Sequence, residues 1–111
     1  MKLLTKSIEA KLRKNATLPD KAKADLKPVL KLFHPCGAAT WLITELWDDG
    51  AMFGLCDLGL GEPELGYVSL EELAQYRGRL GLGIERDRWF TPNKTLAEYA
   101  EEARNLQRIN A

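Results

Sequence analysis

The middle of this chain lacks positive charge. No Lys or Arg occurs from Phe33 to Tyr76, whereas residues 1–32 carry nine Lys or Arg against three acids and residues 77–111 carry seven against five. The formal net charge of zero therefore hides a segregated distribution. The central stretch holds eight carboxylates: Glu45, Asp48, Asp49, Asp57, Glu62, Glu64, Glu71 and Glu72. We expect an acidic centre between two basic ends.

Histidine and cysteine are scarce. His34 is the only histidine, so acid–base catalysis has few candidates. Cys36 and Cys56 are the two cysteines, and in a chain without an export signal we expect reduced thiols rather than a disulfide. No catalytic, nucleotide-binding or metal-binding motif stands out. We therefore expect no catalytic residue, no bound metal and no cofactor.

Long apolar runs are also missing. The leucines between lysines at the N-terminus are too few for the apolar core of a signal peptide, and no later stretch approaches membrane-spanning length. We expect a cytoplasmic protein without membrane contact. A chain of 111 residues with 45% apolar and 29% charged residues is typical of one globular domain, here residues 1–111.

Several short segments have the features of β-strands. Residues 40–47 are dense in aromatic and β-branched side chains, and the Asp-Asp-Gly turn at 48–50 predicts a hairpin with residues 51–57. Residues 65–68 are expected as the third strand of a meander and residues 29–33 as a fourth. Residues 84–90 predict an edge strand or an extended arm.

Three segments predict helices with capped starts. Thr5 precedes an amphipathic pattern over residues 5–14, and the sequences beginning at Ser69 and Thr95 are capping boxes. We expect the helix after Ser69 to end at Gly78. Residues 20–27 are rich in lysine and predict one more helical turn or a connector. The fold class is α+β: a small antiparallel meander sheet of about four strands, with an N-terminal, a middle and a C-terminal helix covering its apolar side.

A combination of motifs resembles a known family. The matching pieces are M-K-L-L-T at 1–5, K-L-F-x-P at 31–35, A-T-W-L-I-T-E at 39–45, F-G-L-C-D-L-G at 53–59, E-L-G-Y-V-S-L-E-E-L at 64–73 and R-G-x-L-G-L-x-I-E-R-D at 77–87. The chain resembles a family of small bacterial proteins called a domain of unknown function, which is carried on plasmids and other mobile elements. The resemblance implies an accessory protein of mobile DNA and brings no functional residues with it.

Carboxylates form the first candidate site. The loop at 62–64 follows a strand that ends at Asp57, and Glu45 lies on the neighbouring strand, so these acids can gather at one end of the sheet. Such a cluster can bind a cation, grip a basic partner or hold an acid of raised pKa. For this cluster we prefer internal pairing with Arg86 and Arg88 across the sheet, and whether the acids are paired in this way or exposed to a partner stays open. The predicted partner-binding residues are Glu45, Asp48, Asp49, Asp57, Glu62 and Glu64.

His34, Cys36 and Cys56 are the second candidate, as zinc ligands with Asp57 as the fourth or as a Cys-His nucleophile pair. Their spacing is poor for zinc, and the strand position of Cys56 favours a small buried hydrophobe. The glycine-spaced runs at 59–61 and 78–83 lack the neighbours of a phosphate loop, so backbone freedom at turns explains them better.

Aromatic and basic side chains form the third candidate. Trp41 and Trp47 share one parity of the strand at 40–47, and Tyr67 and Trp89 are expected nearby. An exposed aromatic stripe beside basic groups can stack bases. Core packing is the stronger expectation for most of these rings. The basic residues cluster in the N-terminal third instead, where a phosphate-facing patch would comprise Lys11, Arg13, Lys14, Lys21 and Lys23.

Three functional hypotheses follow. The favoured one is a non-enzymatic modulator of a mobile element that binds an unidentified protein partner through the acidic sheet and loop surface. The second is nucleic-acid binding through the basic N-terminal third, with affinity that falls as salt rises. The third is a metal-assisted hydrolase that uses the carboxylates or the His/Cys set and retains its metal on purification.

Overall fold

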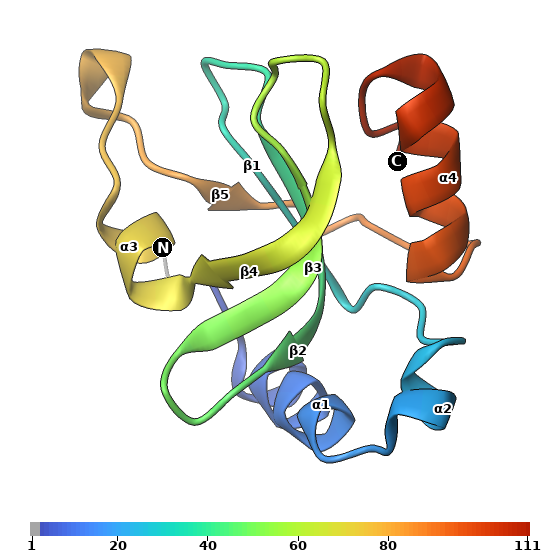
Figure 1. Cartoon of the computed structure of the whole chain (residues 1–111). Helices are drawn as coiled ribbons and strands as arrows, with labels where there is room; N and C mark the ends of the chain where they lie inside the picture. The colour runs from blue at the N-terminus through green and yellow to red at the C-terminus, as the bar shows by residue number, and fades with distance from the viewer. Residues whose placement is uncertain (1–2) are drawn as a thin grey trace.

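The computed structural model describes residues 3–111 and has an α+β architecture (Figure 1). Met1 and Lys2, the start of the M-K-L-L-T motif, lie outside the described residues. The elements in chain order are α1 (Lys6–Ala16), α2 (Asp20–Lys23), β1 (Leu30–Phe33), β2 (Thr40–Leu46), β3 (Ala51–Asp57), β4 (Glu64–Ser69), α3 (Leu70–Gln75), the 3₁₀ turn η1 (Arg79–Gly81), β5 (Glu85–Arg86) and α4 (Leu96–Leu106).

The strands form one antiparallel sheet in the order β4-β3-β2-β1-β5. The predicted meander of β2, β3 and β4 with β1 as a fourth strand is confirmed. Its hairpin turn forms as expected, since Gly50 has a φ of +87° and the Asp49 carboxylate accepts the Ala51 N–H at 3.0 Å. The predicted edge strand is also present, because β5 pairs with β1 through Leu32 and Arg86 and ends the sheet.

A β-bulge interrupts β2 at Thr44. Ile43 lies opposite Gly54, whereas Glu45 lies opposite Phe53, so two residues of β2 advance for one of β3. The Thr44 carbonyl accepts the Asn15 side-chain amide of α1 at 2.9 Å. The extra residue reverses the faces to which odd-numbered and even-numbered side chains of β2 point. Trp41 and Ile43 before the bulge therefore pack in the same core cluster as Leu46 after it. The expectation that Trp41 and Trp47 share a face is therefore wrong.

Helices cover both faces of the sheet. On one face, α1 and α3 pack on a core that includes Trp41, Ile43 and Met52. On the other, Leu96, Tyr99, Ala100 and Ala103 of α4 pack on Leu42 and Leu55. Figure 1 shows α3 and α4 on opposite sides of the strands. The prediction that all helices cover one apolar side is wrong, because β2 is buried on both faces and β3 also contributes to both core clusters.

The predicted helix starts are confirmed. Thr5 accepts the Ile8 N–H at 3.1 Å and Ser69 accepts the Glu72 N–H at 3.1 Å, while Thr95 and Glu98 form a capping box in both directions. The lysine-rich stretch after Pro19 forms the single turn of α2. The middle helix ends earlier than predicted, at Gln75 rather than at Gly78. None of the helices within residues 3–111 has the length and apolar character needed to cross a membrane.

Candidate functional site

Two of the six predicted partner-binding carboxylates are buried. Glu45 is 4% exposed and pairs with Lys23 of α2 at 3.3 Å. Asp57 is 3% exposed, and its two oxygens accept the N–H groups of Gly59 at 2.8 Å and Ile109 at 3.0 Å. Glu45 lies opposite Phe53, near the hairpin, whereas Asp57 lies opposite Thr40 at the other end of the sheet. The structure therefore does not bring these acids together, and both serve the fold.

The internal partners of the acids differ from those expected. Lys23 pairs with Glu45, and Arg13 of α1 reaches Asp48 at 3.7 Å. Arg86 donates to the Leu3 carbonyl at 3.0 Å and lies in β5, which ends the sheet on the edge opposite to β4. Arg88 is exposed beyond β5. The two arginines and the carboxylate of Glu64 consequently sit at opposite edges.

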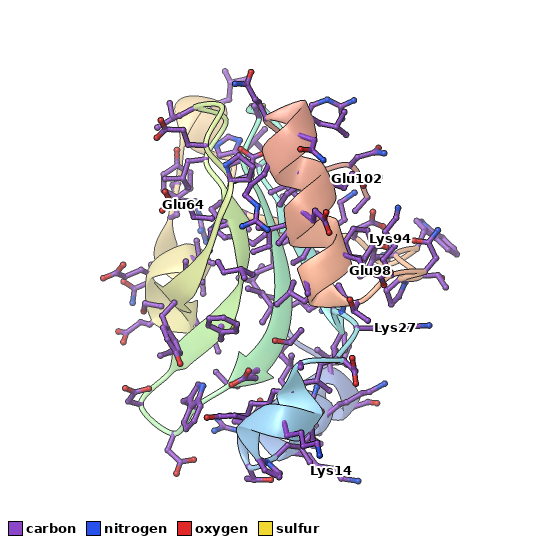
Figure 2. The ribbon with its side chains drawn as sticks, turned by 45° about the vertical axis from the view of Figure 1, so that its right-hand side comes forward. Lys14, Lys27, Glu64, Lys94, Glu98 and Glu102 are labelled. Atoms are coloured by element: carbon purple, nitrogen blue, oxygen red, sulfur yellow. The ribbon has the colours of Figure 1, made fainter. Side chains whose placement is uncertain are left out.

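The other four predicted acids are exposed around β4. Glu62 and Glu64 lie at its N-terminal end, and Figure 2 shows Glu64 far from Lys14. Asp48 and Asp49 lie in the hairpin turn, which is adjacent to the C-terminal end of β4 because Ala51 pairs with Ser69. We call β4 together with the carboxylates of Asp48, Asp49, Glu62 and Glu64 the acidic edge.

Apolar side chains lie between these carboxylates. Leu65 is 46% exposed and Tyr67 is 62% exposed, and the Tyr67 ring lies 5.1 Å from that of Phe53. Leu65, Tyr67, Phe53 and Trp47 line a groove of about 400 Å³ that is bounded by α2 and by the start of α4. A second groove of about 680 Å³, which includes Asp48 and Asp49, shares Trp47 and Tyr67 with the first. Leu65 and Tyr67 thus lie along β4 between the carboxylates of Glu62 and Glu64 and those of the hairpin turn.

The Glu45–Lys23 pair forms part of the first groove. The bulge at Thr44 turns Glu45 to this face, where Lys23 covers it and also lies 4.6 Å from the centre of the Trp47 ring. Trp47 therefore makes a cation–π contact with Lys23, while 37% of its surface remains exposed to solvent. The charges of Glu45 and Lys23 in the groove wall therefore compensate each other within the molecule.

The predicted basic patch is divided. Lys11, Lys14 and Lys21 are exposed, and Lys14 points into solvent from α1 (Figure 2). Arg13 instead pairs with Glu9 at 3.0 Å and with Asp48, and Lys23 is engaged by Glu45. Two of the five predicted cations therefore neutralise carboxylates of the chain itself.

The His/Cys set is also divided. Nδ1 of His34 accepts the Cys36 N–H at 3.0 Å, and its ring meets Tyr76 edge-on at 5.4 Å. Cys56 lies half-buried in β3, where burial raises the pKa of its thiol to about 11, so it stays protonated at neutral pH. Within residues 3–111, no three His, Cys, Asp or Glu side chains form a group able to hold a metal ion. At the glycine-spaced run 59–61, Gly59 and Gly61 have φ near +80°. This confirms the prediction that these glycines supply backbone freedom at a turn.

The exposure of Leu65 and Tyr67 differs from the stronger expectation, which was core packing. The sequence pattern predicts the third strand of a meander here, with most aromatic rings in the core. A signal was available, because no further strand-like segment follows it before the helix at Ser69, which leaves the outer side of this strand without a sequential partner.

Comparison with known proteins supports the resemblance found in the motifs. The family model described as "Protein of unknown function (DUF2958)" matches residues 3–110. A search of curated proteins found no match, and a search of solved structures found none either. Because the family model spans nearly the whole chain, this protein belongs to the DUF2958 family of proteins of unknown function.

Proposed function

We propose that this chain is a non-enzymatic accessory protein of a mobile genetic element that binds a protein partner through its acidic edge. The observation that carries the proposal is the placement of four exposed carboxylates at both ends of a partly apolar edge strand. The mobile-element setting rests on the family resemblance alone.

The composition of the acidic edge resembles that of a protein-binding surface. Tyr67 and Trp47 are the residue types that dominate binding energy at interfaces, and both are partly exposed beside a groove. Removing apolar surface from water contributes about 25 cal/mol per Å² before the costs of association. The surrounding carboxylates would set the encounter rate and the orientation of a basic partner more than its affinity.

A matched pair of charge reversals tests the proposal. We expect E62K/E64K to lose a partner that the tagged unmutated chain captures in extracts of its native host, because the reversal repels a basic surface. D25K/E101K changes the net charge by the same amount at exposed positions outside the acidic edge and should retain that partner. The captured protein is then purified and titrated against each variant by calorimetry.

Both variants are compared with the native chain by circular dichroism, and we expect closely similar thermal midpoints because all four positions are exposed. Equal binding of the purified partner to E62K/E64K and to the native chain would overturn the proposal. Equal loss in both variants would also overturn it, since net charge rather than the acidic edge would then control binding.

A further inference from the structure

We infer that the partner supplies an extended basic segment that adds to β4 as a sixth strand of the sheet. This inference rests on the proposed function and specifies the kind of partner. It depends on three features of the acidic edge: an unprotected strand edge, the direction of its free backbone groups, and the sign of the surrounding charge.

The two edges of the sheet differ in protection. β5 has two residues and is followed by Asp87 and Arg88, so it offers little backbone for pairing. β4 has six residues, contains no Lys, Arg or Pro, and keeps an unbroken register with β3 from Glu64 to Ser69. It thus lacks the bulge, proline or lysine with which proteins usually discourage pairing at an edge. In the order of the described strands, only β3 lies next to β4.

The free backbone groups of β4 can be assigned from the alternation of antiparallel hydrogen bonds. Leu70 N–H donates to the Gly50 carbonyl, so the residue pairs that bond across β3 and β4 alternate from that position. Val68, Gly66 and Glu64 therefore bond toward β3. The N–H and C=O groups of Leu65 and Tyr67 point the other way, toward the open edge, where a peptide strand can bond to them.

The side chains of the same two residues indicate what the added strand would contact. Leu65 and Tyr67 are two positions apart, so they lie on one face, where they line the groove with Trp47 and Phe53. An added strand would place every second side chain over this groove. Apolar residues at those alternate positions would cover Tyr67.

Charge selects a basic segment over a second copy of this chain. The described ion pairs bring one cation, Arg13, to the four carboxylates of the acidic edge, and Glu71 and Glu72 of α3 add further exposed acids beside it. Two copies that paired through β4 would bring these acidic surfaces together, and like charges in proximity oppose association. A cationic strand has the complementary charge.

The probe is a fluorescein-labelled ten-residue peptide that alternates Lys and Val, with a Glu/Val peptide as its counterpart. We expect fluorescence anisotropy to show that the Lys/Val peptide binds the protein and that the Glu/Val peptide does not. Leu65→Pro removes an N–H that points to the open edge, whereas Leu65→Ala keeps it, so Leu65→Pro should bind about tenfold more weakly than Leu65→Ala. Proline is tolerated at such an edge position, which circular dichroism verifies.

Amide hydrogen exchange of the unmutated protein gives a second readout that requires no variant. Binding of the Lys/Val peptide should slow exchange at Leu65 and Tyr67, whose amides face the open edge. The amides of Gly66 and Val68 already bond to β3 and should change little. This measurement applies whether or not Leu65→Pro folds.

The outcomes separate the inference from the proposed function. If E62K/E64K loses the captured partner but the Lys/Val peptide leaves Leu65 and Tyr67 unprotected, strand addition is wrong and binding through the acidic edge stands. If the chain is a dimer that Leu65→Pro dissociates, a second copy occupies β4 and the inference is overturned. Selective protection of the Leu65 and Tyr67 amides supports it.

Discussion

At the scale of single residues, the Glu45–Lys23 pair connects the bulge in β2 to α2. The Glu45 side chain is 6% exposed and that of Lys23 is 16% exposed, so the pair is largely removed from water. Removing one partner of a buried ion pair leaves a charge without compensation, which costs far more than the pair contributes.

We expect Lys23→Ala to lower the free energy of unfolding by about 2–4 kcal/mol. Urea denaturation measures the change, and Lys21→Ala, an exposed lysine on the same helical turn, should shift it by less than about 0.5 kcal/mol. The double variant Lys23→Met/Glu45→Leu should recover part of the loss, because it removes both charges. An effect of Lys23→Ala no larger than that of Lys21→Ala would show that water already stabilises Glu45.

Gly54 is the second residue on which the bulged region depends. A Cβ at this position would lie 2.0 Å from the Leu42 carbonyl oxygen and 2.9 Å from the Ile43 Cα, both backbone atoms that cannot turn aside. We expect Gly54→Ala to destabilise the fold by about 3 kcal/mol or more. Gly66→Ala on β4 is the control, since a Cβ there meets nothing within 4 Å. Thermal unfolding of both variants checks the prediction, and similar midpoints would contradict it.

At the scale of elements, α4 depends on its capped start and on one apolar face. Thr95 accepts the Glu98 N–H at 3.2 Å, and the Glu98 carboxylate accepts the Thr95 N–H at 2.9 Å. These backbone and side-chain hydrogen bonds with Thr95 hold the pKa of Glu98 below its usual value.

The lowered pKa of Glu98 predicts a pH dependence. A carboxylate with a depressed pKa in the folded state stabilises above its unfolded pKa, and the stabilisation is lost as pH falls through the folded value. We expect Glu98→Gln to be less stable than the native chain at pH 7 and the difference to shrink in acid. Urea denaturation from pH 7 to pH 3 measures it. Glu101→Gln, an exposed change outside the capping box, should leave the profile unaltered.

The strands at the two edges of the sheet differ in length and in exposed side chains. β5 is short and flanked by charge, whereas β4 is longer and exposes Leu65 and Tyr67 beside Glu64. Because of this contrast, we expect strand addition at β4 and regard Leu65→Pro as the informative substitution.

At the scale of the whole molecule, Asp57 joins three segments. Its carboxylate accepts one N–H from the loop after β3, at Gly59, and one from the segment after α4, at Ile109. The end of the chain is thereby attached to the sheet near Thr40. Figure 1 shows the C-terminus beside the strands.

We expect Asp57→Ala to destabilise the entire fold by about 2–4 kcal/mol, because it leaves two N–H groups without their charged acceptor. Asp49→Ala is the control, since it breaks one hydrogen bond in an exposed turn and should cost under about 1 kcal/mol. Guanidinium unfolding provides both values. A smaller loss for Asp57→Ala than for Asp49→Ala would assign the C-terminal attachment to other contacts.

Local structure was largely predictable. The caps at Thr5, Ser69 and Thr95, the Asp-Asp-Gly turn and the meander of β2 to β4 were all expected, because each depends on interactions within a few residues or between successive strands. Of the candidate site, the exposure of Glu62 and Glu64 agrees with the expected acidic surface, whereas Glu45 and Asp57 are buried. Both lie in predicted strands rather than in a turn or loop, but the groups that pair with them, Lys23 and the Ile109 N–H, are distant in the sequence.

The amino-acid sequence by itself determined the fold class, the helix starts, the hairpin and the absence of Lys and Arg from residues 33–76. Only the tertiary structure decided which carboxylates are available. Burial depends on groups far away in the chain, such as Lys23 for Glu45 and the Ile109 N–H for Asp57, and on a bulge that inverts the faces of β2. A local pattern cannot encode such contacts, since they form only when the sheet brings distant segments together.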